Sequence, residues 1–383
     1  MKEQLRIEKM VSDGYGLARS SEGVVFVENA CTEDLLEVEI TSQKRGTRFA
    51  KIKKIAEASK YRREAPCVYA KDCGGCDWQH INYQYQIEAK LDIVKDCFKR
   101  IAKINDEIEI VVHHSEEWQY RSRVQIQFNA QGELGFKAKR SHDIVAIKDC
   151  KTLVPALNEL FKTDDDKLFN HPNAKTLMAI SGKDNLICSF PKLKHTELFT
   201  EVEINGFTFK LAGSDFIQNN QFLISELADW VVANVKTKNF VDLYGGTGFF
   251  SVFLSAKCEN GVLVESMPEQ VKRAKENFSK NQIKNVEAIQ SYAKKWFTKN
   301  NKKLKALGTI IVDPPRTGLD KETLSVLSNS MVENIIYISC NPGTLSRDLK
   351  EFLEKGYNIE ECSMFDLYPQ TKHVEVGVVL KKT

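Results

Sequence analysis

The pattern of hydrophobic and polar positions changes along the chain, and the changes divide it into parts. Residues 1–57 alternate apolar and polar positions between glycines, which predicts about five short antiparallel strands in a small β-barrel. Apolar residues recur at helical spacing over 83–103, and strand-like alternation returns over 118–147. From about residue 211 strands and helices alternate, which is typical of an α/β domain. We therefore predict a β-barrel, a central α+β part and a C-terminal α/β part, at 1–57, 58–210 and 211–383.

One stretch of the α/β part places a cysteine between a strand and a helix. Residues 334–339 are apolar and β-branched, as in a buried strand, and apolar residues recur at helical spacing from Leu345 onward. Asn341 followed by Pro342 is typical of a helix start. Cys340 is therefore expected at the carboxyl end of a strand beside a helix N-terminus, where the thiolate is favoured and where open α/β sheets hold their reactive groups. A buried core cysteine is the alternative for this residue taken alone.

A glycine-rich turn follows the first strand of the α/β part. The strand over 239–244 precedes the turn GGTG at 245–248, and the next strand ends in Glu265. An acid in this position commonly hydrogen-bonds a ribose hydroxyl. Ser251 stands where the last glycine of the dinucleotide fingerprint would be. The turn therefore fits a mononucleoside cofactor such as S-adenosylmethionine better than a dinucleotide.

Three cysteines are closely spaced in the central part, and a fourth follows a predicted strand further along. Cys67, Cys73 and Cys76 have neither the two C-x2-C knuckles of many zinc sites nor the C-x3-C-x2-C spacing of radical enzymes. Cys150, after the strand-like run 144–147, is the best candidate for a fourth ligand. Spacing alone leaves zinc and an iron–sulfur cluster both open. Ten cysteines without a secretion signal argue for reduced thiols and a cytoplasmic location.

The composition excludes binding of nucleic acid through bulk charge. Of the 383 residues, 42% are hydrophobic and 28% are charged, the net charge is +3, and no apolar run is long enough to span a membrane. Contact with RNA must therefore come from a local basic surface. Two sets of basic residues could provide one, although a solvated surface is the alternative for each. The first set is Lys44, Arg45, Arg48, Lys51, Lys53 and Lys54, and the second is Arg121, Arg123, Lys137, Lys139 and Arg140 with Tyr120 and Phe136. The acidic run 164–166 is expected to be a surface loop.

Three motifs of the α/β part together resemble those of the RNA uridine-5-methyltransferases. They are DPPR at 313–316, SCNPGTLSRDL at 339–349 and PQTKHVE at 369–375. The resemblance extends over essentially the whole chain and is greatest to the branch that modifies 23S ribosomal RNA. It implies an RNA-binding, OB-like TRAM domain at 1–57, an iron–sulfur domain at 58–210, and a Rossmann-like class I methyltransferase domain at 211–383 that uses S-adenosylmethionine. In this family the helix after the cluster packs on the catalytic domain, which is expected here for residues 79–110.

The resemblance also implies roles for single residues. Cys340 corresponds to the nucleophile and Glu375 to the base. The family's cofactor-binding positions are Gln218, Tyr244, Phe249, Glu265 and Asp313, and its [4Fe–4S] ligands are Cys67, Cys73, Cys76 and Cys150. Three positions depart from the family pattern. Gly245 replaces a usual cysteine, Phe249 stands where a polar residue often lies, and Tyr292 stands where many relatives have an aspartate that contacts adenine.

The implied activity is methylation of uridine C5 in RNA. Uracil C5 is a poor nucleophile, and addition of a thiolate to C6 enables C5 to accept a methyl group. A base must then remove the C5 proton so that the thiolate leaves. We expect a cytoplasmic monomer without membrane contact that acts on 23S ribosomal RNA, with the transfer-RNA T-loop as the alternative substrate.

Two other functions compete with this prediction. A cytosine-C5 methyltransferase would also need a cysteine nucleophile, whereas a non-catalytic RNA-binding or assembly factor would need neither Cys340 nor Glu375. Amino-group methyltransferases have an aromatic residue where this chain has Arg316, so methylation of an exocyclic nitrogen is disfavoured.

Overall fold

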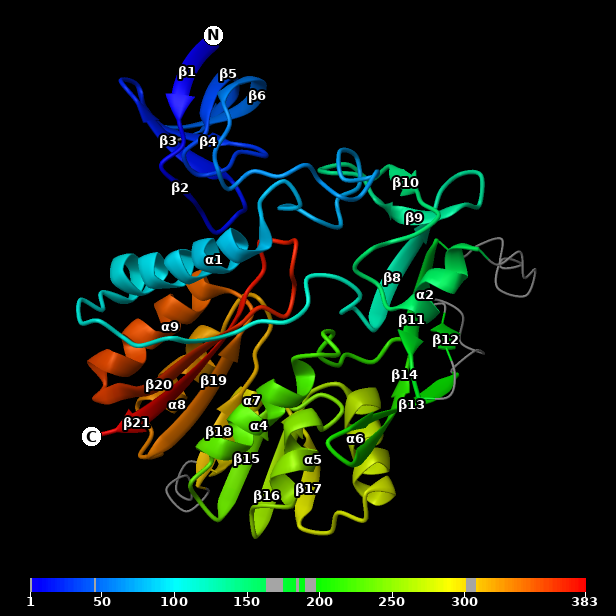
Figure 1. Cartoon of the computed structure of the whole chain (residues 1–383). Coiled ribbons are helices and arrows are strands. Elements are labelled where there is room, and N and C mark those ends of the chain that lie inside the picture. The colour runs from blue at the N-terminus through cyan, green and yellow to red at the C-terminus, as the bar shows by residue number, and fades with distance from the viewer. Residues whose placement is uncertain (1, 45, 163–174, 184–185, 190–197, 301–307) are drawn as a thin grey trace.

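The chain folds into three parts, which Figure 1 shows with the N-terminal strands at the top, the central strands at the right and the large sheet with its helices below. The computed structural model describes residues 2–44, 46–162, 175–183, 186–189, 198–300 and 308–383. The acidic run 164–166 lies outside the described residues. No helix in the described ranges is long and apolar enough to cross a membrane.

The alternating positions of the N-terminal part form a six-stranded sheet with the order β1-β5-β6-β4-β3-β2. Neighbouring strands are antiparallel except for β4 and β6, which run parallel. The core includes Leu5, Ile7, Val25, Leu36 and Val38, the positions that the period of two assigns to one face. The strands are β1 Lys2–Arg6, β2 Lys9–Met10, β3 Gly16–Ser20, β4 Gly23–Val27, β5 Leu35–Lys44 and β6 Thr47–Glu57.

The central part contains an antiparallel sheet with the order β10-β9-β8-β11-β12 and a separate hairpin of β13 and β14. Val124 and Ile126 of β8 alternate inward and pack with Leu157 and Leu177. The elements are β8 Arg123–Phe128, β9 Leu134–Lys137, β10 Ile144–Ala146, α2 Pro155–Asn158, the 3-10 helix η2 Glu159–Phe161, β11 Thr176–Ser181, β12 Leu186–Ser189, β13 Phe199–Ile204 and β14 Phe207–Ala212.

The C-terminal part is built on an eight-stranded sheet with the order β17-β16-β15-β18-β19-β21-β20-β7. The strands from β17 to β19 are parallel, and β21 and β20 add an antiparallel pair. This mixed sheet confirms the predicted Rossmann-like α/β fold. The strands are β15 Asn239–Leu243, β16 Asn260–Glu265, β17 Val286–Gln290, β18 Thr309–Val312, β19 Asn334–Ser339, β20 Tyr357–Phe365 and β21 Glu375–Lys382.

Helices cover both faces of this sheet, because its central strands are apolar on both sides. One face packs against α4, α5 and α6, with Leu227, Phe250 and Ala274 in the core. The other face packs against α7, α8 and α9, with Phe297 and Leu345 in a second core. The helices are α4 Ile224–Asn234, α5 Phe249–Ser255, α6 Pro268–Lys280, α7 Ala293–Asn300, α8 Lys321–Ser328 and α9 Pro342–Glu354.

Two elements that come before residue 211 also pack with this sheet. The helix α1 (Tyr83–Cys97) continues as the π-helix η1 (Phe98–Ala102), and Ile87, Val94 and Phe98 lie in the same core as α9. The strand β7 (Val111–His113) pairs parallel with β20 at the edge of the sheet. Figure 1 shows α1 alongside α9. The grouping in space therefore differs from the order along the chain.

Candidate active site

Cys340 lies at the carboxyl end of β19, as its sequence context predicts. The strand ends one residue before it and α9 begins two residues after it. The Asn341 side chain caps α9 by accepting hydrogen bonds from the backbone N–H groups of Gly343 (3.0 Å) and Thr344 (3.3 Å). The thiol is half-buried. The predicted strand and helix start are thus confirmed.

The pairing of β19 with β21 brings Glu375 beside Cys340. The two strands are antiparallel, and the last pair in their register is Ser339 with Val376. Cys340 follows Ser339, and Glu375 precedes Val376, so the two are the next positions at the same edge of the sheet. Opposite residues of antiparallel strands lie about 4.5–5.5 Å apart between their Cα atoms. Glu375 is only 2% exposed. Two predicted site residues that are distant in sequence therefore meet.

Burial and neighbouring charges control the protonation of both groups. Burial raises the pKa of the Cys340 thiol to about 11, with a further rise from Glu375, whereas Arg316 lowers it. Burial also raises the pKa of Glu375 well above its usual range, with a further rise from Asp313 and an opposing effect of Arg316. Burial therefore favours the protonated form of both groups, and Arg316 is the cation that favours their charged, reactive forms.

The turn after β18 brings Asp313 and Arg316 to the same edge of the sheet. The backbone oxygen of Arg316 accepts hydrogen bonds from the Asn341 side chain (3.3 Å) and the Thr344 hydroxyl (3.2 Å), which joins this turn to the start of α9. Burial raises the pKa of Asp313 to about 7, and Asp242 on the neighbouring strand β15 adds to the rise. Sequence reasoning assigned no site role to Arg316, and its place in the DPPR motif was the available signal.

Two further side chains border the site without having been predicted. Burial raises the pKa of Tyr368 to about 12, and the charges of Glu375 and Cys340 are among the causes, so the phenol lies near both. Burial lowers the pKa of His373 to about 4, with a further decrease from Arg316, so this imidazole is neutral at physiological pH. The ring centroids of Tyr368 and His373 are 6.1 Å apart. His373 could have been found from its motif, whereas Tyr368 lies just before the motif and carried no signal.

The glycine-rich turn after β15 holds Glu265 in place. The Glu265 carboxylate accepts hydrogen bonds from the backbone N–H groups of Gly246 (3.2 Å), Ser266 (2.6 Å) and Met267 (2.8 Å). Gly248 has a φ of +90° and precedes α5, a conformation that glycine adopts without steric cost. The acid at the end of the second strand therefore lies beside the turn, as predicted.

Two residues in or just before this turn, and one residue that follows β14, each have a buried polar atom with no hydrogen-bond partner within the described part of the chain. These atoms are Asp242 Oδ1, Thr247 Oγ1 and Gln218 Oε1. The other oxygen of Asp242 accepts a 2.7 Å hydrogen bond from the Ser251 hydroxyl, and burial raises the pKa of Asp242 to about 7. Buried polar groups are usually paired, so unpaired ones mark a site for a ligand. Gln218 was predicted to bind the cofactor, whereas Asp242 and Thr247 were missed.

Tyr244 and Tyr292 line one cavity of about 260 Å³ beside the turn, together with Ser266 and Asp320. Phe249 does not line it. Its ring packs 5.0–5.9 Å from those of Phe209, Phe250 and Phe253, and the residue is 8% exposed. The sequence-predicted cofactor residues are therefore divided between a cavity and the adjacent core.

The four cysteines of the predicted cluster line one pocket at the edge of the central sheet. Its wall is formed by Cys67, Cys73, Cys76 and Cys150 together with Arg121 and Lys151. Within the described ranges, no group of three or more His, Cys, Asp or Glu side chains is arranged to hold a single metal ion. A tetrahedral zinc site would need sulfurs roughly 3.8 Å apart. The structure thus brings the four thiols together around a shared space.

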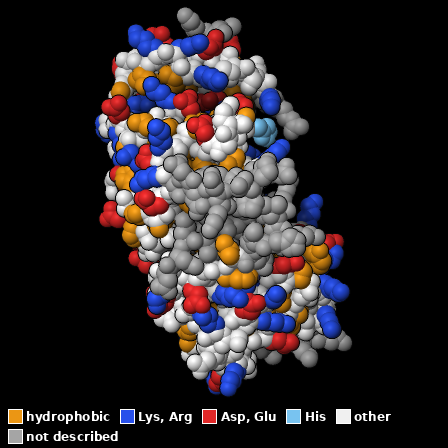
Figure 2. All heavy atoms as spheres, turned by 90° about the vertical axis from the view of Figure 1, so that its right-hand side faces the viewer, with side chains coloured by type: hydrophobic (Ala, Val, Ile, Leu, Met, Phe, Trp, Pro, Cys, Tyr) orange, Lys and Arg blue, Asp and Glu red, His pale blue; other side chains and the backbone are white. Residues whose placement is uncertain are grey.

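Some members of the two predicted basic sets are buried or paired with acids. In the first, Arg48 is 2% exposed and pairs with Glu3 (2.5 Å) and Glu22 (2.8 Å), while Lys53 pairs with Glu39 (2.6 Å). Arg48 therefore stabilises the N-terminal sheet and is not available as a contact for RNA. In the second set, Tyr120 is buried and Arg140 pairs with Glu28. Figure 2 shows lysine and arginine side chains mixed with acidic ones on the face over the central part. Arg45 lies outside the described residues.

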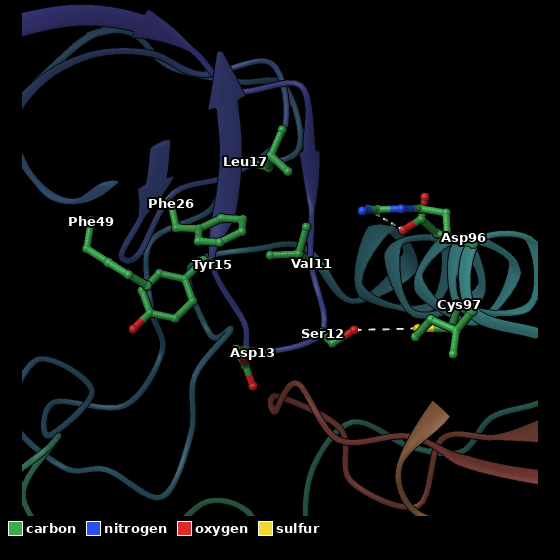
Figure 3. Close-up of a pocket in the computed structure, with 11 residues that line it drawn as sticks. Val11, Ser12, Asp13, Tyr15, Leu17, Phe26, Phe49, Asp96 and Cys97 are labelled. Atoms are coloured by element: carbon green, nitrogen blue, oxygen red, sulfur yellow. Dashed lines mark hydrogen bonds and ion pairs between the residues drawn. The ribbon is translucent and has the colours of Figure 1, made fainter. Parts of the chain in front are cut away.

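A hollow of about 370 Å³ separates the N-terminal sheet from α1 (Figure 3). Tyr15, Phe26 and Phe49 form one side, with ring centroids 5.6–6.0 Å apart, and Asp96 and Cys97 of α1 lie on the other. The Arg140 guanidinium lies 4.9 Å from the centre of the Tyr15 ring. Half-buried aromatic rings beside a cation are a common platform for unpaired bases.

Comparisons with known proteins find a family model that matches the C-terminal half of the chain and relatives that align with its full length. The sequence model of a family described as tRNA (uracil-5-)-methyltransferase matches residues 192–383. An uncharacterized RNA methyltransferase of Thermotoga maritima is 30% identical over 441 aligned positions, which cover 100% of this chain and 99% of that protein. A protein of Mannheimia succiniciproducens named 23S rRNA (uracil(1939)-C(5))-methyltransferase RlmD is 31% identical, with coverage of 100% and 97%.

A solved structure shows the same similarity in fold. The tRNA (uracil-54, C5)-methyltransferase of Pyrococcus abyssi in complex with S-adenosyl-L-homocysteine has a TM-score of 0.77 to this chain at 21% identity. The match covers 99% of this chain and 100% of that one. At this identity the likeness concerns the fold.

Proposed function

This chain belongs to the RNA (uracil-5-)-methyltransferase family, and we propose from that premise that it methylates C5 of a uridine in 23S ribosomal RNA, with Cys340 as nucleophile and Glu375 as base. The observation that supports these roles best is the pairing of β19 with β21, because it places the thiol and the carboxyl group at one edge of the sheet. An RNA-binding assembly factor would need no such pair. Membership of a uracil-specific family also argues against cytosine as the target.

In the proposed reaction, the Cys340 thiolate adds to C6 of uracil, and the electron density gained at C5 allows C5 to accept a methyl group. S-adenosylmethionine supplies that methyl group when bound. The thiol must first lose its proton, and Arg316 favours this step because its positive charge lowers the pKa of Cys340. Arg316 is thus proposed to activate the nucleophile.

Glu375 then removes the proton from C5. The electrons of that C–H bond form the C5–C6 double bond, the C6–S bond breaks, and Cys340 is released as a thiolate. Burial raises the pKa of Glu375, so its carboxylate is a stronger base than an exposed one. The positive charge of Arg316 lowers the pKa of Glu375 and so favours the carboxylate form that accepts the proton.

The residues around the glycine-rich turn fit S-adenosylmethionine. Gln218, Asp242 and Thr247 each offer a buried polar atom that has no hydrogen-bond partner among the described residues, and Glu265 is fixed beside the turn, where it can accept hydrogen bonds from ribose hydroxyls. Tyr244 and Tyr292 line the adjacent cavity, which suits a flat adenine ring. Phe249 and Asp313 stay predicted cofactor positions; the Phe249 ring packs in the core at the start of α5.

The four-cysteine pocket fits a [4Fe–4S] cluster, because four cysteine thiolates are the usual ligands of such a cluster and all four cysteines line one pocket. Arg121 and Lys151 in the pocket wall would offset the negative charge of four thiolates. Cys67, Cys73, Cys76 and Cys150 are therefore the proposed ligands. The proposed chemistry needs no redox step, so we assign the cluster a structural role.

The N-terminal part is proposed to bind RNA as a TRAM domain, with the hollow beside α1 as a contact for an unpaired base. Stacking on Tyr15, Phe26 and Phe49 accounts for sequence-tolerant binding. Phe49→Ala should weaken binding of a 23S fragment about tenfold without changing its salt dependence, since no phosphate contact is lost. Unchanged affinity in Phe49→Ala would show that the hollow is not part of the RNA-binding surface of the protein.

The function is tested by trapping the covalent intermediate. RNA that carries 5-fluorouridine should form a denaturation-resistant adduct with the wild-type protein and S-adenosylmethionine, because fluorine cannot leave as a cation. Cys340→Ala and Cys340→Ser should abolish both the adduct and turnover. The matched control is Cys258→Ala, which removes a buried thiol that follows the C-terminal end of α5. An adduct that persists in Cys340→Ala would refute the assignment.

A further inference from the structure

The loop between β20 and β21 carries the chain into Glu375, and Gln370 lies at its centre. Gln370 is fully buried and has a φ of +68°, which is uncommon for a residue other than glycine. A conformation of this kind persists where surrounding contacts hold it. The contacts of Gln370 come from three segments that are far away in sequence.

The backbone of Gln370 is bonded to the turn that follows the cysteine-rich loop. Its carbonyl oxygen accepts hydrogen bonds from the N–H groups of Asp77 (3.0 Å) and Trp78 (2.9 Å). These two residues come directly after Cys76, one of the proposed cluster ligands. A single carbonyl therefore joins the end of the cysteine-rich loop to the loop that leads to Glu375.

The side chain of Gln370 is hydrogen-bonded at both its polar atoms. Its Oε1 accepts from Gln86 Nε2 on α1 (3.0 Å) and from Arg63 Nη2 (2.9 Å), and its Nε2 donates to Glu117 Oε2 (2.9 Å). Gln86 Oε1 in turn accepts from the Gln370 N–H group (2.9 Å). Arg63 and Glu117 form an ion pair with each other at 2.7 Å. Every polar atom of Gln370 therefore takes part in at least one hydrogen bond.

Other contacts hold the first half of the same loop. Lys90 Nζ on α1 lies 2.6 Å from Asp366 Oδ1, and both side chains are fully buried. The Tyr120 hydroxyl donates a 3.0 Å hydrogen bond to the backbone oxygen of Pro369. Removing one partner from such a network leaves buried groups unpaired, which is costly. The loop is thus held mainly by residues outside the C-terminal sheet.

We propose that Gln370 is a positioning residue that couples the cysteine-rich loop to the base Glu375, so that the base is in place only while that loop is ordered. This inference rests on the proposed function only in naming Glu375 the base. The coupling itself is a physical link between residues 73–78 and 369–375. It gives the four-cysteine site a role in the reaction that involves no electron transfer.

The kinetic test uses the full-length protein and the variant Gln370→Met, which keeps the size of the side chain and removes its amide. Glu375 acts after addition and methyl transfer, so the variant should release product at least about tenfold more slowly, and covalent enzyme–RNA intermediate should accumulate on ordinary RNA. S-adenosylhomocysteine affinity should change less than about twofold. The control Asn285→Met removes an amide that bonds the backbone oxygens of Ser255 and Cys258, both at 2.9 Å, away from the site.

The outcome that overturns the kinetic claim is equal slowing of addition and release in Gln370→Met, or an effect no larger than that of Asn285→Met. Absence of the 5-fluorouridine adduct in the wild-type protein would instead refute the proposed function. The two failures are therefore distinguishable.

The physical coupling has a test that does not depend on activity. Hydrogen exchange is measured on the protein as purified anaerobically, after iron removal with chelator and oxidant, and in Cys76→Ser. In both altered forms the amides of 369–376 should exchange about tenfold faster, while those of 240–248 in and after β15 stay within about twofold. In Gln370→Met the 369–376 amides should already exchange fast, and iron removal should add little. Unchanged exchange over 369–376 when the cysteine-rich loop is perturbed would overturn the proposal.

Discussion

The Cys340 thiol lies opposite the Glu375 carboxyl group at the ends of two paired strands, and burial raises the pKa of both groups. The charge of Glu375 adds to the raised pKa of Cys340, so the base disfavours ionisation of the nucleophile. Arg316 opposes this effect on both groups. The reaction therefore depends on a cation whose backbone is fixed to the start of α9.

The first prediction concerns the pH dependence of adduct formation. Because the pKa of Cys340 is raised to about 11, the thiolate fraction and the single-turnover rate of adduct formation should rise with pH throughout pH 6–9. Loss of the positive charge in Arg316→Gln should raise this pKa further and slow the step at every pH in that range by about tenfold or more. The control Lys350→Gln removes a half-exposed cation from α9. Equal rates of adduct formation in Arg316→Gln and the wild type across pH 6–9 would contradict the role of Arg316.

The second prediction concerns the base. Glu375→Gln keeps the shape of the side chain and cannot accept a proton, so addition and methyl transfer should continue while release slows by about 100-fold or more. Covalent enzyme–RNA intermediate should therefore accumulate on ordinary substrate, as measured on denaturing gels. Release at the wild-type rate would mean that another group, such as His373 or Tyr368, removes the proton.

The third prediction concerns the glycine-rich turn. A Cβ atom on Gly248 would lie 2.9 Å from the Phe278 ring, at a φ of +90° that side chains disfavour. Gly206, at a φ of +81°, has no atom within 4 Å of such a Cβ, so Gly206→Ala controls for the backbone effect alone. Gly248→Ala should lower the thermal midpoint more than Gly206→Ala and weaken S-adenosylhomocysteine binding in calorimetry, because the turn also holds Glu265. The backbone effect common to both variants is about 1–2 kcal/mol. Equal loss of stability in both would contradict the packing argument.

Local signals in the sequence predicted the strand and the helix on either side of Cys340. They did not predict which distant residues pack beside Cys340. The Asn341–Pro342 pair specified the start of α9 because capping depends on neighbouring residues only. The position of Glu375 depends on the register of β21, which local patterning does not determine, and only the family resemblance identified it. The Gln370 network joins residues 284 positions apart, so no local pattern could predict it.

Predictions of surface and domain organisation that used charge counts or the order of segments along the chain were the least reliable. Arg48 was counted as basic surface because a charge count does not include the acids that face it, and Glu3 and Glu22 neutralise it inside the fold. The strand β7 precedes the α/β pattern by about a hundred residues, and it joins that sheet because β20 offers an unpaired edge. Tertiary contacts decided both features.

The fourth prediction concerns the four-cysteine pocket. Protein purified without oxygen should be brown and contain about four irons per chain, as a thiolate-held cubane requires. Cys76→Ser should lose most of the iron, whereas Cys258→Ser, at a buried cysteine outside the pocket, should keep it. Iron content and the absorption spectrum provide the measurement. Zinc found without iron under these conditions would rule out the cluster.

The last prediction concerns the RNA. The relatives named as 23S ribosomal RNA methyltransferases align with nearly the full chain at 28–31% identity, whereas the transfer-RNA enzyme of Pyrococcus abyssi is 21% identical and shows likeness in fold. We therefore expect methylation of a 23S fragment, with weaker activity on transfer-RNA transcripts. The measurement is a map of 5-methyluridine in both RNA pools of a strain that lacks the gene, with the Cys340→Ala gene as the control for effects of the protein without catalysis. Loss confined to transfer RNA would overturn the choice of substrate, and it would leave the roles of Cys340 and Glu375 intact because the same addition to C6 methylates either uridine.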